Sequence, residues 1–300
     1  MPNRDDSRAR DLHAFEKARP VLLGLAYRIL GSQADAEDAV QDTFIKWEQT
    51  DKAGIDNPIA WLTTACTRRC IDLLRAAHRT RVEYIGAWLP EPIQTSSMDA
   101  TESDPSLGAS LSTAFMLMLE RLTPKERAAY LLHEIFDMTY PDIARTLEIQ
   151  ETTCRKLVSR ARANIDQAKV RHVTPRDRQE QLLAAFETAL TSGSTAPLAA
   201  LLSDEIELAA DSGGKVPAIG RILRGKEEVL DFVFRALRRY WHTYRRTPLD
   251  LNGARGLIVH RDGLPSAAVS FAYDQAGRVT NIYIMRNPDK LSRLDRSWAV

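Results

Sequence analysis

The spacing of apolar residues predicts that the N-terminal half of the chain consists of helices. The first one has apolar positions three or four residues apart, at Leu22, Leu25, Ala26 and Ile29. Gly31 and Ser32 stop this helix, and a second helix follows at once. The second helix has two contrasting faces. Its apolar face comprises Ala36, Val40, Thr43, Phe44 and Trp47, and its acidic face comprises Asp35, Asp38 and Asp42.

A third helix is predicted to start at Asn57, which can cap it, with Pro58 at the first position where a missing N–H costs nothing. Two stripes run along it, half a turn apart. The apolar stripe comprises Ile59, Leu62, Cys66, Cys70, Leu73 and Ala77. The other stripe places a tryptophan among arginines and comprises Trp61, Thr64, Arg68, Asp72, Arg75 and Arg79.

Residues 85–110 lack this periodicity. They contain three prolines, many serines, four acidic residues and no basic residue. This composition favours an extended acidic linker over a folded element.

Beyond the linker, the pattern predicts a helix-turn-helix between about Thr139 and Ala168. One helix starts near Leu111, another at Thr123 and Pro124, and a short one at Thr139, Tyr140 and Pro141. The last helix starts near Glu151 and buries Cys154, Leu157, Val158, Ala161 and Ile165. Its exposed front then presents Thr152, Arg155, Lys156 and Ser159.

The pattern changes after Thr174 and Pro175. It predicts two short helices, a strand near Glu205 to Ala210, a glycine-bearing loop and a helix from Lys226 to Trp241. Alternating strands follow at 243–251, 256–261, 266–273 and 278–286, joined by the turn signals Asn252-Gly253, Asp262-Gly263 and Gln275-Ala276-Gly277. This order indicates a separate α+β domain.

Composition adds broad limits. With 300 residues, 44% of them hydrophobic and 27% charged, the chain is long enough for two or three compact units. It has neither an apolar leader nor a run of roughly 18 to 20 apolar residues, so we expect it in the cytoplasm. Its cysteines, Cys66, Cys70 and Cys154, lack histidines at metal-site spacing, so we expect buried thiols and neither a disulfide nor a metal site.

The net charge of +1 argues against a nucleic-acid-binding protein only until its distribution is considered. Residues 33–50 hold five acidic residues and one basic residue. Residues 57–81 hold five arginines and one acid, and residues 151–172 hold six basic and two acidic residues. The acidic segment and the two basic segments therefore suit different partners.

Each charged segment has a functional and a structural interpretation. Arg155, Lys156, Ser159 and Arg160 can enter the major groove of DNA, or form a solvated basic face. The stripe around Trp61 can hold a melted strand, with guanidinium groups on phosphates and the ring against a base, or Trp61 can pack on a neighbouring helix. The acidic face can meet a basic protein or only water.

Three strings, in this order, resemble the extracytoplasmic-function sigma factors. DAEDAVQDTFIKW is similar to the family's contact with core RNA polymerase, and NPIAWLTTACTRRCIDLLR to its minus 10 reading and melting helix. LTPKERAAYLLHEIFDMTYPDIARTLEIQETTCRKLVSRARA resembles its minus 35 reading domain. The likeness extends from about Phe15 to Ala168 and implies a bacterial alternative sigma factor, whose partners are core RNA polymerase and promoter DNA.

This resemblance assigns roles to residues. It implies polymerase binding by Asp38, Gln41, Asp42 and Phe44, and promoter reading by Arg68. Taken with the charged stripes, we expect minus 10 contacts by Trp61, Thr64, Arg68, Arg69, Arg75 and Arg79. We expect minus 35 contacts by Thr152, Arg155, Lys156, Ser159 and Arg160. The expected domains are 1–84 for polymerase binding and the minus 10 element, the linker 85–110, and 111–172 for the minus 35 element.

The tail resembles the subgroup with a fused SnoaL-like domain, here residues 175–300. The likeness rests on AWLPEP, DSGGKVPA and NPDKL, although Ser212 stands where that subgroup more often has glycine. It implies a curved antiparallel sheet with helices, forming a cone that can hold a small ligand, and control in cis without a separate anti-sigma factor. The residues expected to make regulatory contacts are Trp88, Glu91, Asp211, Gly213, Gly214, Lys215, Asn287, Pro288, Asp289, Lys290 and Leu291. Lys215 can pair with linker acids such as Glu91, and Asp289 can cap a closing turn after Pro288, or the segment can be a turn without a regulatory role.

Two other classes stay open: a one-component regulator with a ligand-binding tail, and a SnoaL-like enzyme fused to a DNA-binding region. Asp211, His260, Tyr273 and Tyr283 are conceivable acid or base groups, but no spacing ties them together. We therefore expect no catalytic site and no cofactor.

Overall fold

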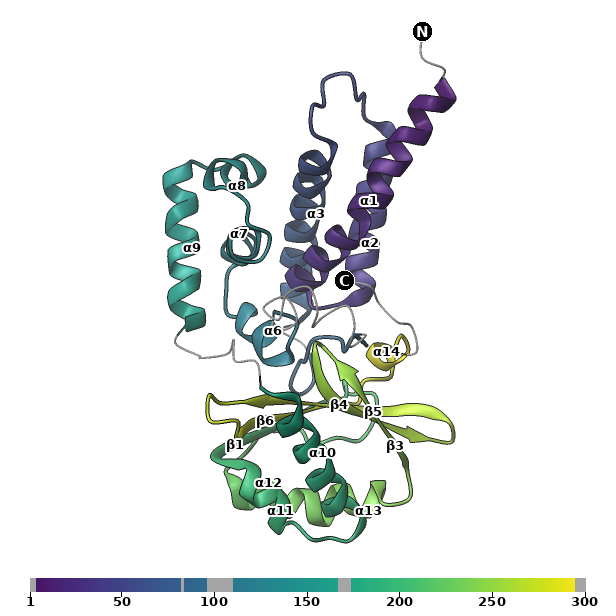
Figure 1. The fold of residues 1–300 in the computed structure, drawn as a ribbon, viewed down its shortest axis with the longest axis vertical. Helices are drawn as coiled ribbons and strands as arrows, with labels where there is room; N and C mark the ends of the chain where they lie inside the picture. Colours follow the sequence, from purple (N-terminus) through teal and green to yellow (C-terminus); the bar gives the residue numbers. More distant parts are fainter. Residues whose placement is uncertain (1–3, 82–83, 96–109, 167–173, 295–300) are drawn as a thin grey trace. The chain divides into compact units, whose positions relative to one another are not determined.

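The computed structural model describes residues 4–81, 84–95, 110–166 and 174–294, and it divides into two compact units (Figure 1). The N-terminal unit comprises residues 1–80 and 119–165, and the C-terminal unit comprises residues 81–118 and 166–299. The chain thus starts in the N-terminal unit, passes through the C-terminal unit at residues 81–118, returns to the N-terminal unit at 119–165 and ends in the C-terminal unit. No described helix is long and apolar enough to span a membrane.

The N-terminal unit contains six of the described helices. They are α1 (Arg4–Leu30), α2 (Gln33–Gln49), α3 (Pro58–Arg81), α7 (Pro124–Glu134), α8 (Tyr140–Leu147) and α9 (Glu151–Asp166). Their boundaries follow the local signals in the sequence. Gly31 has a φ of 71°, and the Ser32 hydroxyl accepts from the Asp35 N–H at 3.2 Å, so that one helix stops and the next is capped.

The apolar stripe of α3 differs from the prediction at its ends. Leu62, Cys66 and Cys70 are fully buried, as expected. Ile59, in the first turn of α3, is 47% exposed, so the apolar stripe that packs in the unit begins at Leu62. Farther along, Ile71 is buried.

The helix-turn-helix is confirmed as α8 and α9. Thr139 caps α8 by accepting from the Asp142 N–H, and Glu148 ends it in the left-handed region at a φ of 53°. The positions predicted to be apolar on α9 are buried at Cys154, Val158, Ala161 and Ile165. The packing thus leaves the basic side of α9 exposed to solvent.

The C-terminal unit is built on a six-stranded curved sheet, in the order β2-β1-β6-β5-β4-β3. Its strands are β1 (Leu202–Asp211), β2 (Leu223–Arg224), β3 (Arg245–Leu251), β4 (Ala254–Arg261), β5 (Leu264–Tyr273) and β6 (Val279–Met285). All neighbours pair antiparallel except β1 and β6, which are parallel. The curved sheet with helices confirms the predicted fold class, and β2 and the parallel pair are additions to it.

Helices cover one face of the sheet. They are α10 (Arg176–Thr191), α11 (Ala196–Leu201), α12 (Lys226–Phe232), a π-helical turn (Val233–Leu237) and α13 (Arg238–Trp241), which lie together in Figure 1. The sheet side chains on this face include Ile206, Val259 and Ile284, and they form the larger core with Phe186 and Trp241. The predicted helix from Lys226 to Trp241 is therefore present, interrupted by the π-helical turn.

The opposite face of the sheet is covered by segments from both ends of the unit. Two helices lie there, α6 (Thr113–Leu119) and α14 (Pro288–Leu291). Leu89 and Leu291 form a second core with Tyr283 and Met285, and Leu117 of α6 packs against it. The linker is extended, as predicted, but its described part is packed onto the sheet.

Candidate functional site

The acidic helix α2 has two expected site residues in solvent and two held by neighbours. Asp38 and Gln41 are exposed. Asp42 accepts from Arg69 Nε of α3 at 2.7 Å. Phe44 is half-buried, with its ring 4.6 Å from that of Phe15. The part of α2 that remains open to a partner is thus the side carrying Asp38 and Gln41.

Trp61 packs against a neighbouring helix in this structure. Its ring centroid lies 5.3 Å from that of Trp47 of α2, and its side chain is half-buried. Farther along α3, Arg75 lies 3.5 Å from Asp72 and is exposed. The Arg79 side chain lies outside the described residues.

Arg68 is held by the C-terminal end of α8. Its Nε donates to the Thr146 carbonyl at 2.8 Å, and Nη2 donates to the Arg145 carbonyl at 3.0 Å. Its Nη1 lies 2.8 Å from the Glu148 carboxylate. A helix C-terminus carries partial negative charge on its last carbonyl groups, so it suits a guanidinium. Thr64 adds a fourth contact, with its hydroxyl 3.0 Å from that of Thr146.

This contact joins two residues assigned to the minus 10 element, Arg68 and Thr64, to a helix of the domain assigned to the minus 35 element. It uses the donor groups that Arg68 would need for a phosphate or a base edge. The amphipathic pattern could not show it, because the partner atoms are mostly backbone carbonyls at the end of another helix.

The front of α9 carries the predicted minus 35 residues. All five of them, Thr152, Arg155, Lys156, Ser159 and Arg160, are exposed. Arg155 donates from Nε and Nη2 to the Glu151 carboxylate at 3.0 and 2.7 Å, and its guanidinium lies 4.3 Å from the Tyr140 ring centroid. These contacts hold Arg155 against the first turns of both helices of the motif.

In the C-terminal unit, Asp211 is a fully buried carboxylate with a complete set of donors. One oxygen accepts from the Tyr84 hydroxyl at 2.5 Å and the Gly213 N–H at 3.0 Å. The other accepts from the Leu89 N–H at 2.9 Å and from Lys290 Nζ at 2.7 Å. Asp211 therefore joins the linker, the glycine-bearing loop and α14.

Lys290 and Asn287 connect α14 to the linker. Lys290 Nζ also donates to the Leu89 carbonyl at 2.6 Å, and it lies 4.5 Å from the Trp88 ring centroid. Asn287 Nδ2 donates to the Tyr84 hydroxyl at 2.9 Å. Burial, and then the hydrogen bond to Asp211, raise the pKa of Tyr84 above its usual value.

The backbone conformation and close surroundings of position 213 require a glycine. Its φ of 58° is a left-handed conformation, and a Cβ there would lie 2.5 Å from Asn287 Nδ2. Gly214 has a φ of 71°, and a Cβ there would lie 3.0 Å from Ile85 Cδ1. The glycines thus permit the loop to lie against both α14 and the linker.

Two expected contacts are wrong in detail. Lys215 pairs with Asp289 and not with Glu91, which is buried in the linker with 3% exposure. Asn287 caps α14, since its side chain accepts from the Asp289 N–H at 3.1 Å, so Asp289 is not the cap. Asparagine fits because its short carbonyl can reach the second N–H of the helix, which Asp289 itself supplies.

Sequence reasoning missed Tyr84 and Asn252. The linker's Ile93 N–H donates to the Asn252 side chain at 3.3 Å, and Asn252 N–H donates back to the Ile93 carbonyl at 2.9 Å. Asn252 had been assigned only to a turn, and its φ of 53° confirms that turn. An aromatic residue three positions before the start of AWLPEP was the one available signal for Tyr84.

The four conceivable acid or base groups do not converge. Tyr273 packs against the helix-covered core, whereas Tyr283 belongs to the core on the opposite face. Asp211 is fully occupied, and His260 lies at the end of β4. No cluster of three metal-ligating side chains occurs among the residues described. The three cysteines are free in this structure, and all three are buried, as predicted.

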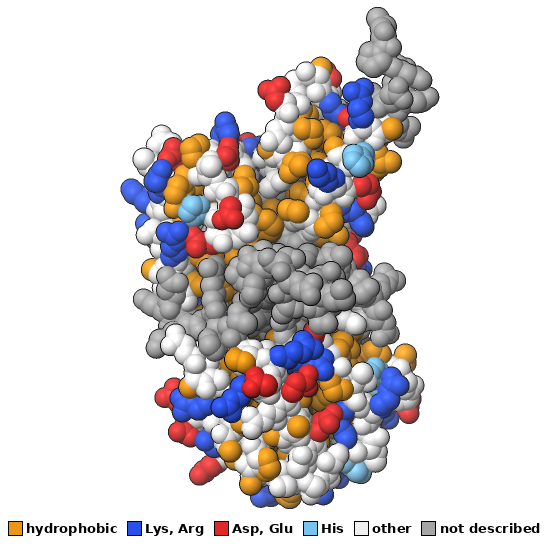
Figure 2. Space-filling view, in the orientation of Figure 1, with side chains coloured by type: hydrophobic (Ala, Val, Ile, Leu, Met, Phe, Trp, Pro, Cys, Tyr) orange, Lys and Arg blue, Asp and Glu red, His pale blue; other side chains and the backbone are white. Residues whose placement is uncertain are grey.

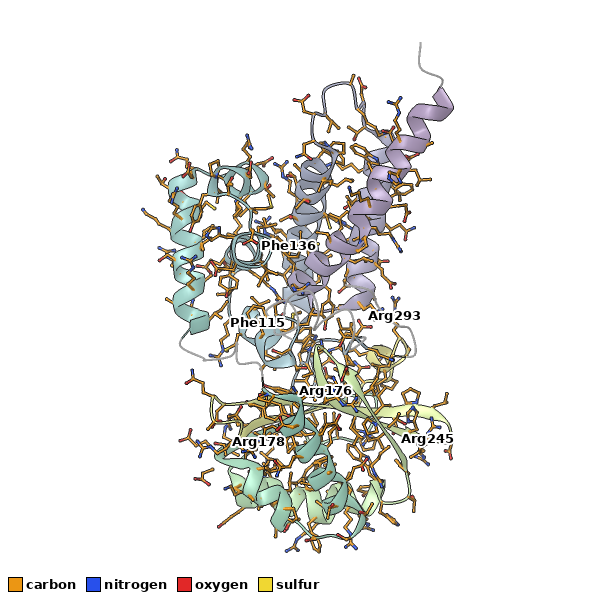
Figure 3. All side chains as sticks on the ribbon, in the orientation of Figure 1. Phe115, Phe136, Arg176, Arg178, Arg245 and Arg293 are labelled. Carbon is orange, nitrogen blue, oxygen red and sulfur yellow. The ribbon has the colours of Figure 1, made fainter. Side chains whose placement is uncertain are left out.

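Figure 2 shows how charge is distributed on one face of the molecule. Acidic and basic side chains intermingle on the C-terminal unit in this view. The surface ion pairs of this unit include Arg224 with Glu207 at 3.0 Å. Arg176 and Arg178 lie on α10 in Figure 3. Exposed pairs of this kind stabilise a protein little.

The comparisons with known proteins agree with the two N-terminal domains and extend to the tail. Residues 14–80 match the family Sigma-70 region 2, and residues 112–165 match Sigma-70, region 4. The chain is 32% identical over 295 residues to the ECF RNA polymerase sigma factor SigJ of Mycobacterium tuberculosis, covering 94% of this chain and 93% of that protein.

Two further matches have similar extent. The probable ECF RNA polymerase sigma factor SigI of the same species is 29% identical over 288 residues, covering 94% of each chain. The crystal structure of SigJ aligns with a TM-score of 0.74 at 30% identity, covering 94% of this chain and 99% of that one. The likeness therefore includes the C-terminal unit.

Proposed function

The chain belongs to the extracytoplasmic-function sigma factors of the sigma-70 family, and from this membership we propose that its C-terminal domain controls its activity in cis. Members of the family bind core RNA polymerase and direct promoter-specific transcription initiation. The fused domain would add control over when the two promoter-reading domains can act.

The family assigns surfaces on the N-terminal unit to each partner. We assign polymerase binding to α2, with Asp38 and Gln41 as the exposed contacts and Phe44 and Asp42 as residues that shape the surface. The arginines of α3 would hold the minus 10 element, and the exposed front of α9 would read the minus 35 element in the major groove. These sites would act in the cytoplasm, where core polymerase works.

The single observation that supports control in cis is the set of contacts around Asp211. The described residues at both ends of the linker belong to the C-terminal unit: residues 84–95 at its start, and residues 110–118 at its end and just after it. Tyr84, Leu89 and Ile93 are tied to it by hydrogen bonds, and Thr113 Oγ1 lies 3.0 Å from Ser270 Oγ. Because this linker connects the two promoter-reading domains, fastening it restricts how far apart they can move.

The Arg68 contact gives the control a second component. A sigma factor at a promoter must read two separated DNA elements, so region 2 and region 4 must each present a free surface. In the arrangement described here, α3 and α8 share hydrogen bonds through Arg68 and Thr64. Release of the linker would let these helices separate on polymerase, and retention would keep them together.

We assign no enzymatic role to the tail, because its acid and base candidates lie on different faces of the sheet. We also assign it the task that a separate anti-sigma factor performs for other sigma factors. A fused domain acts at high effective concentration, so modest contacts are sufficient to restrain the linker.

Reconstituted transcription tests the proposal. Core polymerase would be combined with the full chain, a chain that stops before Asn287, and a chain that stops after Thr174. The first truncation removes Lys290 and the cap of α14, and the second removes the whole fused domain. Lys290→Met and Lys215→Met in the full chain provide a matched pair, because only the first lysine contacts Asp211 and the linker.

We expect the full chain and the truncated chains to differ in initiation at the same promoter, and Lys290→Met to shift activity in the same direction as the stop before Asn287. Equal activity from all chains would contradict control in cis. Failure of every chain to support initiation at any promoter would instead contradict the sigma-factor assignment for this chain.

A further inference from the structure

Four arginines gather at one end of the curved sheet, where β4 turns into β5. Arg245 and Arg246 begin β3, Arg261 ends β4, and Arg286 follows β6. Figure 3 labels Arg245 at this end of the sheet. The register pairs Arg245 with His260 and Arg246 with Val259, so the first two residues of β3 point to opposite faces.

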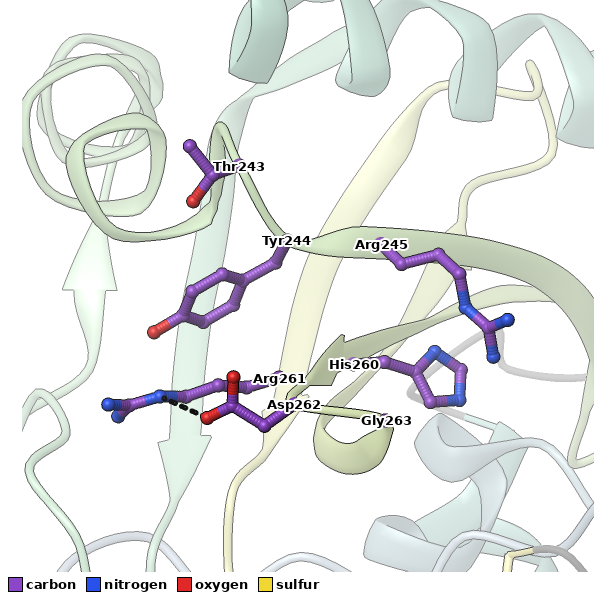
Figure 4. Close-up of a pocket in the computed structure, with 7 residues that line it drawn as sticks. All are labelled: Thr243, Tyr244, Arg245, His260, Arg261, Asp262 and Gly263. Carbon is purple, nitrogen blue, oxygen red and sulfur yellow. Dashed lines mark ion pairs between the residues drawn. The ribbon is translucent and has the colours of Figure 1, made fainter.

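A cavity opens at this end. Its volume is about 610 Å³, and it is lined by Thr243, Tyr244, Arg245, His260, Arg261, Asp262 and Gly263. In Figure 4, Tyr244 and Arg261 lie on one side of the paired strands, and Arg245 and His260 lie on the other. The volume is within the range of small-molecule sites, which is roughly 300 to 1,000 Å³.

Two more guanidinium groups, those of Arg246 and Arg286, belong to the same end of the sheet but are not among the residues that line the cavity. Arg246 shares the face of Val259, which belongs to the helix-covered core. Its Nη1 donates to the carbonyls of Trp241 and Tyr244 at 2.5 and 3.0 Å, but its Nε is buried without a hydrogen-bond partner. One N–H group of this guanidinium is thus removed from water and makes no hydrogen bond.

Arg286 repeats the pattern. Its Nη1 donates to the Pro217 carbonyl at 2.5 Å, and its Nε is likewise buried without a partner. Burial lowers the pKa of Arg286. The Tyr244 side chain opposes this shift and the charge of Arg261 adds to it, so both side chains are close enough to Arg286 to act on it. Arg286 therefore lies near two of the residues that line the cavity.

The group has little negative charge to balance it. Among the described residues, Asp262 is the only carboxylate within 4.0 Å of any of the four guanidinium groups, and it lies 3.5 Å from Arg261 in an exposed position. Buried N–H groups without partners are costly, and cations of like sign placed together repel. An anion bound beside Arg261 and Arg286 would reduce this repulsion.

We propose that this cavity binds a small molecule through a carboxylate or phosphate group held by Arg261 and Arg286 beside Tyr244. The planar guanidinium fork matches both oxyanions and can bind either with two parallel hydrogen bonds. The ring of Tyr244, which packs against the core, offers an apolar wall for the rest of the molecule. A membrane or a DNA duplex fits less well, because Nε of Arg246 and of Arg286 is buried below the surface.

Binding to the full chain tests the site directly, without reference to transcription. Inorganic phosphate and succinate would be titrated separately by calorimetry and by thermal unfolding, with sodium chloride at equal ionic strength as the reference. Arg261→Gln and Arg286→Gln each remove one of the proposed ligands. Arg224→Gln is the matched control, since Arg224 lies on β2 at the other edge of the sheet and also pairs with an acidic residue, Glu207.

We expect saturable binding of at least one of the two anions, weakened tenfold or more by Arg261→Gln and by Arg286→Gln, and changed less than twofold by Arg224→Gln. Binding of phosphate alone or succinate alone would identify the oxyanion. If Arg286→Gln does not fold, Arg261→Gln decides, because its side chain is 66% exposed. Absence of saturable binding for both anions, or equal binding by wild type and Arg261→Gln, would overturn the site.

Discussion

Lys290 Nζ donates to the buried carboxylate of Asp211 at 2.7 Å and to the carbonyl of Leu89 at 2.6 Å. One ammonium group thus neutralises a carboxylate in the sheet and holds the linker backbone. The aromatic rings of Trp88 and Tyr84 lie 4.5 and 5.1 Å from the same nitrogen and shield it from water. A contact of this kind is sensitive to the loss of either charge, because the surroundings cannot solvate the remaining one.

Lys290→Met should therefore destabilise the C-terminal domain. The methionine keeps most of the apolar stem but leaves the charge of Asp211 without its counter-ion, and such losses cost about 3 to 5 kcal/mol. Calorimetry of the full chain would measure the unfolding transition of this domain.

Lys215→Met is the control for that change. Lys215 and Asp289 are 51% and 65% exposed, so their ion pair should be worth about 0 to 1 kcal/mol. Equal and small effects of the two substitutions would show that Asp211 does not depend on Lys290.

Tyr84→Phe should change how stability depends on alkaline pH. The pKa of Tyr84 is raised in the folded chain. Its contribution to the free energy of unfolding is therefore fully present below about pH 10, the usual tyrosine pKa, and is lost as the pH rises beyond it. Above about pH 10 the unfolded chain binds fewer protons than the folded chain, so the free energy of unfolding falls with pH.

Urea unfolding between about pH 9 and pH 11 would measure this dependence. The wild-type free energy of unfolding should fall more steeply with pH than that of Tyr84→Phe. Tyr273, whose pKa burial also raises, gives the same slope in both proteins and so cancels in the comparison. Parallel curves would mean that the Tyr84 hydroxyl titrates as it does in water.

Most of the helices, strands and turns could be predicted from local signals in the sequence. Thr123 and Glu126 form a reciprocal cap at the start of α7, and Asn252-Gly253 and Asp262-Gly263 both have positive φ in hairpin turns. Such features depend on residues a few positions apart, so the sequence displays them. The parallel pairing of β1 with β6 joins residues far apart in the chain and leaves no local pattern.

In the candidate site, too, some residues could be predicted from the sequence, but their contacts with distant partners could not. The residues in the strings DSGGKVPA and NPDKL were identified by resemblance, and several of them meet at Asp211. The partners of these residues could not be predicted from the sequence. Tyr84 and the backbone of Leu89 belong to no recognisable motif. Arg68 binds backbone carbonyl groups, which every residue possesses. Backbone partners cannot be inferred from side-chain patterns.

Arg155→Ala should weaken recognition of the minus 35 element. If Arg155 reads a base, the loss should be about 1 to 3 kcal/mol and confined to one position of the promoter, whereas a phosphate contact would weaken binding to all sequences alike. Binding of holoenzyme to promoter variants at fixed salt separates the two. Arg162→Ala is the control, because Arg162 is held 2.6 Å from Glu134 of α7. Unchanged promoter use by Arg155→Ala would exclude both roles.

Glu148→Gln and Arg68→Gln should have opposite effects on promoter opening. Both weaken the contact between α3 and α8, because each removes one side of the 2.8 Å ion pair. Glu148→Gln leaves Arg68 available for DNA, so opening should rise, by at most about fivefold for an exposed pair worth up to 1 kcal/mol. Arg68→Gln removes the proposed DNA contact, so opening should fall despite the weaker restraint.

Abortive initiation assays would measure opening, and amide hydrogen exchange at residues 145–149 would report the contact itself. Exchange should accelerate in both variants and stay unchanged in Asp137→Asn, a control at an exposed acidic residue whose φ of 49° asparagine tolerates. Faster exchange without any change in opening would show that the contact does not limit initiation. Slower opening by Glu148→Gln would show that the contact assists initiation, which is the reverse of the proposed restraint.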